Sequence, residues 1–162
     1  MTRLRSELDR LYHPSPSPGT ADAGTTRCLV LLCKRPGAWP ALRPAWQGVQ
    51  ADLGWPAPAI VVDGVDAIEL WFSFQDALSE EQAQGLGQAL VSHYLPDVLP
   101  GRAQVRLQAV SAHIGAMPPF ERLPGQWSAF VAPDLAAVFA DDPWLDMPPG
   151  EDVQADLLSR LR

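Results

Sequence analysis

The sequence has few charged residues, few cysteines and histidines, and no long apolar run. Charged residues occupy 19% of the 162 positions, with 2 cysteines, 3 histidines and a formal net charge of −7. No stretch approaches the roughly 18 apolar residues of a membrane-spanning helix, and the start, MTRLRSELDRLY, lacks the apolar core of a secretory signal. We therefore expect a cytoplasmic, bacterial-type protein with no membrane partner. Its acidic balance disfavours a nucleic-acid partner, because gripping phosphates requires a basic surface.

Motifs that anchor cofactor, metal or nucleophile chemistry are also missing. There is no GxxxxGK[ST] or GxGxxG loop, no nucleophile-elbow serine or cysteine, and no HxxxH or HExxH pair. Cys28 and Cys33 are five positions apart in CLVLLC, which places them on opposite faces of a strand. They can then neither pair nor share a metal ion. We predict buried, reduced thiols, no cofactor and no metal.

Apolar residues and prolines are abundant. Apolar residues make up 47% of the chain and 17 residues are proline, which is typical of one domain with many rigid turns. Residues 1–12 have leucines at helical spacing and predict an amphipathic helix. Residues 13–26, HPSPSPGTADAGTT, contain almost nothing to bury and predict a flexible linker. The helix must then dock on the body of the protein, on a neighbouring chain or on a partner.

The body, residues 27–132, alternates strand and helix patterns. Hydrophobic periodicity predicts strands at 27–33, 59–62, 67–74 and 103–110, and helices at about 41–53 and 79–94. Asp63-Gly64-Val65-Asp66 predicts the turn of a β-hairpin, and Ser79 with Gln82 predicts a capping box. The order β-α-β-β-α-β predicts an α+β, ferredoxin-like (RRM-like) domain, with a four-stranded antiparallel sheet and both helices on one face.

The remaining chain, residues 133–162, predicts an extension that packs on this domain. Trp127–Ala132 predicts a fifth strand just before it, and Pro133 and Asp134 open a short helix. A last amphipathic helix is predicted from four apolar positions at helical spacing, Val153, Leu157, Leu158 and Leu161.

One face of the predicted sheet is polar but carries a tryptophan. Trp71, flanked by Gln104 and Arg106, could stack a nucleic-acid base or receive a peptide. The alternative, which the apolar content of the C-terminal extension favours, is that this extension covers the face and buries Trp71. Lys34 and Arg35, at the end of the first strand, are either an anion-binding turn or a solvated loop, and we favour the loop.

Three acidic residues, Asp63, Asp66 and Glu69, lie within seven positions of each other, in and just after the hairpin turn. A two-metal catalytic site needs carboxylates that converge on the ions, which here requires the turn to fold back toward the polar face. The alternative is ordinary turn chemistry for the aspartates and a solvated Glu69, or one paired with Arg106. The spacing matches no metal motif, so we interpret the stretch as a hairpin with a polar turn.

The layout DGVDAIELWFSF followed by DALSEEQAQGLGQAL resembles the RRM-like core of primase-polymerase (archaeo-eukaryotic primase-like) proteins, over about residues 27–110. The family's paired DxD carboxylates have no match, since Asp63 and Asp66 are separated by two residues. The resemblance therefore implies a degenerate relative that binds nucleotide or single-stranded nucleic acid, or, if the three acidic residues converge, a nucleotidyl enzyme. Our leading hypothesis is a noncatalytic interaction domain that binds a protein partner or self-associates through its terminal helices and an open sheet edge.

Overall fold

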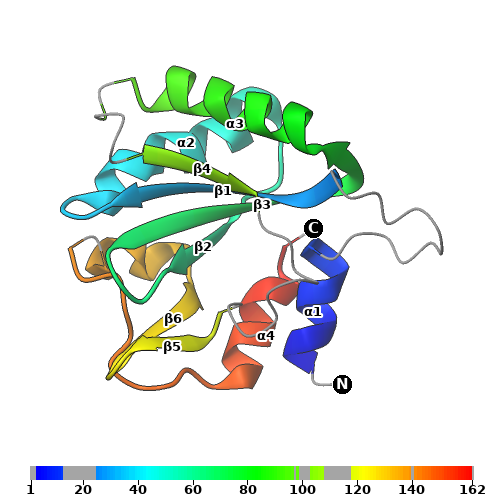
Figure 1. The fold of residues 1–162 in the computed structure, drawn as a ribbon. Helices are drawn as coiled ribbons and strands as arrows, with labels where there is room; N and C mark the ends of the chain where they lie inside the picture. The colour runs from blue at the N-terminus through cyan, green and yellow to red at the C-terminus, as the bar shows by residue number, and fades with distance from the viewer. Residues whose placement is uncertain are drawn as a thin grey trace.

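The computed structural model describes residues 3–12, 25–96, 98, 103–107, 118–139 and 141–161. These residues form a mixed α+β structure around one antiparallel sheet (Figure 1). Its helices are α1 (Arg3–Tyr12), α2 (Ala38–Leu53), α3 (Glu80–Tyr94), the 3-10 helix η2 (Pro133–Phe139) and α4 (Glu151–Ser159). Its strands are β1 (Thr25–Lys34), β2 (Ala59–Val62), β3 (Ala67–Ser79), β4 (Ala103–Leu107), β5 (Phe120–Leu123) and β6 (Gln126–Val131).

The sheet has six strands in the order β4-β1-β3-β2-β6-β5, and every neighbouring pair is antiparallel. Val62 of β2 pairs with Ile68 of β3, which confirms the predicted hairpin. The predicted fifth strand is confirmed as β6, but the sheet is not four-stranded as expected, because β6 pairs with β2 and the unpredicted β5 pairs with β6. All four residues of β5, Phe120-Glu121-Arg122-Leu123, are exposed. Its sequence therefore lacks the alternation of apolar and polar residues that marks a half-buried strand.

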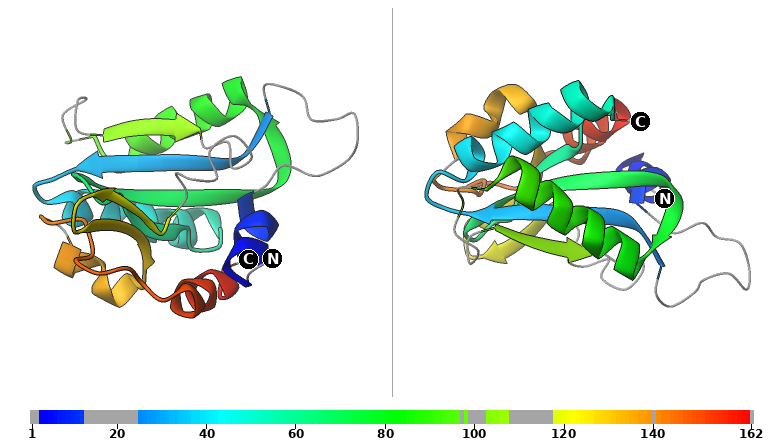
Figure 2. Two further views of the ribbon diagram at one scale, coloured as in Figure 1. Left: turned by 60° about the horizontal axis from the view of Figure 1, so that its bottom comes forward. Right: turned by 90° about the horizontal axis from the view of Figure 1, so that it is seen from above.

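The two faces of the sheet carry separate hydrophobic clusters. On one face Ile68, Leu70 and Phe72 pack under α2 and α3, and Cys33 lies in the same cluster. On the other face Cys28 packs with residues of α1 and α4. Figure 2 shows α2 and α3 lying across one side of the sheet, with α1 and α4 on the other. The two cysteines therefore face opposite sides, and both are free and buried, as the alternation of a strand requires.

The predicted helix ends are confirmed by local geometry. The Ser79 hydroxyl accepts a hydrogen bond from the Gln82 backbone N–H, and the Gln82 side chain accepts one from the Ser79 N–H, so the capping box forms. Gly54 ends α2 with a φ of 67°, a left-handed conformation that glycine adopts without strain. Gly37 begins α2 without a side chain of its own to cap it.

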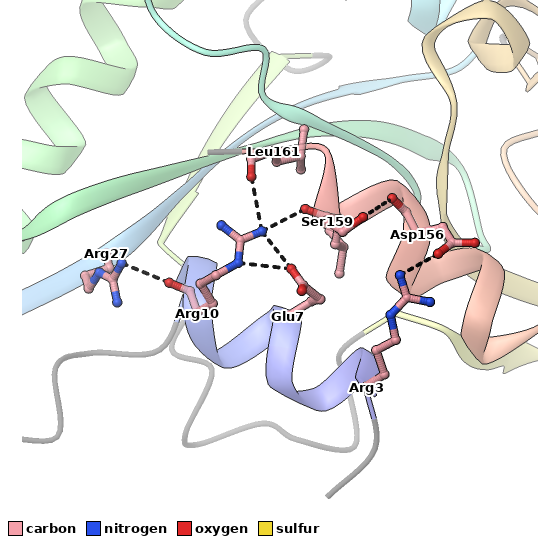
Figure 3. A network of polar contacts seen from close by, with 8 residues as sticks. Arg3, Glu7, Arg10, Arg27, Asp156, Ser159 and Leu161 are labelled. Atoms are coloured by element: carbon pink, nitrogen blue, oxygen red, sulfur yellow. Dashed lines mark hydrogen bonds and ion pairs between the residues drawn. The ribbon is translucent and has the colours of Figure 1, made fainter.

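Helix α1 docks on the body of the protein (Figure 3). Its apolar side is buried through Leu4, Leu8, Leu11 and Tyr12. The Arg10 guanidinium donates to the carbonyls of Leu158 and Leu161 at the end of α4, at 3.0 and 3.1 Å. A cation at this position complements the negative end of the α4 dipole. Of the three possibilities, docking on the body, on a neighbouring chain or on a partner, the structure shows docking on the body.

Some predicted segment boundaries need correction: β3 continues to Ser79 rather than ending at residue 74, α2 begins at Ala38 rather than at about residue 41, and β1 begins at Thr25. Thr25 pairs with Ser79 and Thr26 with Leu78, so both belong to β1 rather than to the predicted linker. The rest of that linker, and residues 108–110 of the predicted last strand, lie outside the described residues. No helix in the described part of the chain is long and apolar enough to cross a bilayer.

Candidate functional site

The aspartate at the start of the hairpin turn organises that turn. Asp63 Oδ1 accepts hydrogen bonds from the backbone N–H groups of Val65, Asp66 and Ala67, at 2.8, 2.9 and 3.0 Å. Burial raises the pKa of Asp63 above its ordinary value of 3.8, these backbone donors lower it, and the charge of Glu69 raises it further. The Asp63 carboxylate therefore stabilises the conformation of the turn.

The other two acidic residues are not arranged as metal ligands. Glu69 is 3% exposed and accepts a hydrogen bond from the Trp71 indole N–H at 2.9 Å, so the expectation of a solvated Glu69 is wrong. Asp66 lies in the turn, where its carbonyl accepts from the Arg35 N–H. Among the described residues no three histidine, cysteine or carboxylate side chains lie close enough to hold a metal ion. The hairpin with a polar turn is what the structure contains.

Residues of the C-terminal extension contact the turn that follows β1. The Gly37 N–H donates to Asp141 Oδ1 at 2.9 Å, so Asp141 caps α2 from outside the helix. Arg35 lies 3.6 Å from the Asp142 carboxylate and over the Trp144 ring, 5.3 Å from its centroid. The Arg35 side chain is exposed, as expected for a solvated loop, and acidic residues of the extension lie beside it. The Lys34 side chain is half-buried at the end of β1.

The face that carries Trp71 is covered. Trp71 is 2% exposed and lies between Tyr12 of α1 and Phe130 of β6, with ring centroids 5.3 and 5.7 Å apart in edge-to-face geometry. Leu158 of α4 belongs to the same cluster. An open stacking platform at Trp71 is therefore wrong, and the alternative, burial by the C-terminal extension, is correct, with α1 as a second cover.

Two further residues predicted for the polar face lie on the edge strand β4. Gln104 is exposed and pairs with Leu32, and the Arg106 backbone pairs with Val30. The side chain of Arg106 lies outside the described residues. Only β1 separates these two positions from β3, and Val30 of β1 pairs with both Arg106 and Trp71.

A groove opens where β3 continues past the beginning of β2. Residues 55–59 form one wall, and β3 residues between Trp71 and Leu78 form the other, around a volume of about 500 Å³. We call this the aromatic groove. Tyr12, Trp71 and Phe72 are buried at its floor, whereas Trp55 and Phe74 are half-buried and Asp76 is exposed.

Backbone chemistry explains why the aromatic groove exists. Strand β3 has 13 residues and β2 has 4, and pairing between them ends at Ala59 and Trp71. Pro56 and Pro58 precede β2 and have no N–H to donate, so they cannot prolong its ladder along β3. The two segments therefore diverge and leave a hollow between them.

A second, smaller pocket shares residues 57–59 and Leu161 with the groove. It holds about 310 Å³ and is lined by residues 57–60, Phe130 and Val131 of β6, Pro133, and Leu157, Leu158, Arg160 and Leu161. Among the described residues of this lining, Arg160 is the one that is charged. We call it the Arg160 pocket.

Sequence reasoning did not single out Trp55, Phe74, Asp76 or Arg160 as site residues. The usable signal was Trp-Pro-Ala-Pro just before a strand, because two prolines there prevent pairing with a longer neighbour. Comparisons of the chain with protein-family models, curated proteins and solved structures find no match. The case for a function therefore rests on the geometry of these residues.

Proposed function

We propose that the protein is a noncatalytic interaction domain whose aromatic groove binds a proline-rich segment of a partner protein. The observation that carries this proposal is the groove itself, a hollow of about 500 Å³ lined by two half-buried aromatic side chains, Trp55 and Phe74. Ligand sites in proteins are concave and mostly apolar, with a few polar groups that set orientation.

The described acidic residues support a binding function over catalysis. Asp63 holds the turn through three backbone hydrogen bonds, and Glu69 is buried against the Trp71 indole. A nucleotidyl enzyme would need these carboxylates free to bind metal ions. Their structural use favours the noncatalytic alternative.

The lining of the groove favours an extended, proline-rich peptide. Segments in the polyproline II conformation dock on grooves lined by aromatic rings, and they lose little entropy on binding because they are already extended. Trp55 and Phe74 supply the rings, and Asp76 supplies an exposed negative charge at the same rim. A basic residue beside the prolines of the partner would complement Asp76 and the net charge of −7.

The strand order supports a more specific fold assignment. Strands β4-β1-β3-β2, with α2 and α3 on one face, have the arrangement of a ferredoxin-like, RRM-like core, to which β5, β6, α1 and α4 are additions. We propose this fold assignment, and with it that the resemblance to primase-polymerase proteins reflects layout only.

Calorimetric titration with the peptide acetyl-APPLPPRA-amide tests the groove. We expect Trp55→Ala to weaken binding roughly tenfold or more, since a rim aromatic is a typical binding hot spot. Leu53→Ala is the matched control, because Leu53 is exposed close by but does not line the groove. Asp76→Asn should weaken binding and reduce its salt dependence, whereas Asp134→Asn should not.

Three outcomes would overturn the proposal. The first is that the wild-type chain does not bind the peptide. The second is that Trp55→Ala and Leu53→Ala behave alike. The third is salt-sensitive binding of a ten-nucleotide oligothymidine without binding of the peptide, which would favour the nucleic-acid alternative.

A further inference from the structure

The Arg160 pocket differs from the aromatic groove in its chemistry. Of the eleven described residues that line it, ten are alanine, proline, isoleucine, valine, leucine or phenylalanine, and the eleventh is arginine. Its volume of about 310 Å³ is at the lower end of the range for small-molecule sites. Apolar walls with a single cation match a ligand that has an apolar body and one negative charge.

Arg160 stands out among the arginines of this face. Arg3 pairs with Asp156, and Arg10 pairs with Glu7 and with the end of α4. Arg160 is exposed at the C-terminal end of α4, and within the described chain it forms no ion pair or side-chain hydrogen bond. Arg160 lines the pocket, and a guanidinium offers planar, two-pronged hydrogen bonding that carboxylates match.

We propose that the Arg160 pocket binds a small apolar monocarboxylic acid, with its hydrocarbon part between β6 and α4 and its carboxylate on Arg160. A medium-chain fatty acid of about ten non-hydrogen atoms has a size suited to a pocket at this end of the range. This inference goes beyond the proposed function, because it concerns a different pocket and a different class of ligand.

A purely structural role for Arg160 makes a different prediction. Arg160 caps α4, where a positive charge stabilises the helix dipole without any ligand. In that case its removal would lower the stability of the protein but would not alter discrimination between charged and uncharged ligands.

The experiment is a calorimetric titration of the full chain with sodium octanoate and with octanamide, which has the same shape but no charge. We expect octanoate to bind roughly tenfold more tightly, because hydrogen bonds between charged groups are the strong ones. Arg160→Gln should reduce octanoate binding to the octanamide level and leave octanamide unchanged. Arg43→Gln is the matched control, since Arg43 is also exposed but does not line the pocket.

A cavity-filling variant tests the pocket independently of the charge. Leu157→Phe should fill the space and reduce the binding of both octanoate and octanamide. Equal affinity of the wild type for the two ligands, octanoate binding that survives Arg160→Gln, or no binding of either ligand would each overturn the inference. Binding of the proline-rich peptide is measured separately, so each proposal can fail without the other.

Discussion

The acidic residues of the hairpin illustrate how one side chain can be mistaken for a catalytic group. Asp63 accepts hydrogen bonds from three backbone N–H groups of the turn. Gly64, in the same turn, has a φ of 87°. A β-carbon at Gly64 would lie 2.8 Å from Arg122 Cγ and 2.9 Å from the Ser128 nitrogen, so glycine is required there. The same residue types that suggest a metal site are here the parts of a close-packed turn.

We predict opposite effects for two substitutions of Asp63. Asp63→Ala leaves three backbone donors without their acceptor and should lower the free energy of unfolding by roughly 1–3 kcal/mol. Asp63→Asn keeps an acceptor oxygen and removes the charge that burial disfavours, so it should raise the free energy of unfolding. Urea unfolding of both variants and of the wild type at pH 7 checks this, and equal losses would contradict it.

The pH dependence of Asp63→Asn is a second readout of the same group. Because the pKa of Asp63 is raised in the folded state, the folded chain binds this proton more tightly than the unfolded chain. The contribution of Asp63 to stability therefore falls as the pH rises from 3.8 through the raised folded value. Asparagine does not titrate, so the stability of Asp63→Asn relative to wild type should be higher at pH 7 than at pH 3.

At the scale of elements, the segment Asp141–Leu145 joins three parts of the fold. Asp141 caps α2, the Pro143 carbonyl accepts from the Gly64 N–H in the hairpin turn, and Leu145 bridges to Trp127 of β6. Helix α2 begins at a glycine, so its orphan N–H groups need an acceptor from elsewhere. The extension supplies one and is thereby fixed to the body.

We predict that two neighbouring aspartates of this segment differ in their effect on stability. Asp141→Ala should cost roughly 0.5–2 kcal/mol, as for loss of a helix N-cap. Asp142→Ala should cost roughly 0–1 kcal/mol, because its ion pair with Arg35 is long and exposed. Chemical unfolding with far-ultraviolet circular dichroism distinguishes them, and a larger loss for Asp142→Ala would refute the capping role.

For the whole molecule, the decisive feature is that helices cover both faces of the sheet. Helices α1 and α4 seal the face that holds Val30, Trp71 and Phe130, which would otherwise be an exposed apolar surface (Figure 1). The apolar side of α1 is buried against the sheet of the same chain, so it is not available to a partner while α1 is docked. Self-association through this helix would require it to leave the sheet.

We predict that undocking α1 makes the protein self-associate. Leu8 is 4% exposed against the covered face, so Leu8→Asp should destabilise the docked helix by roughly 3 kcal/mol or more. The uncovered apolar surface should then raise the mass measured by light scattering as protein concentration increases. Arg3→Ala, which removes only an exposed ion pair with Asp156, is the control and should leave the mass unchanged.

The sequence by itself determined those features that depend on neighbours along the chain. The hairpin between Val62 and Ile68, the capping box at Ser79 and the alternation of buried side chains along β3 were all predictable, because periodicity, turn chemistry and caps act over a few residues. The opposed cysteines follow from the same alternation.

Tertiary structure alone decided which surfaces are open. Whether Trp71 would be exposed depended on where α1 and α4 dock, and the contact of Arg35 with Asp142 joins residues more than 100 positions apart. The strand β5, with its exposed residues, carries no burial pattern and forms only because β6 is there to pair with it. The aromatic groove likewise arises from two strands of unequal length, a relation between elements that no local pattern specifies.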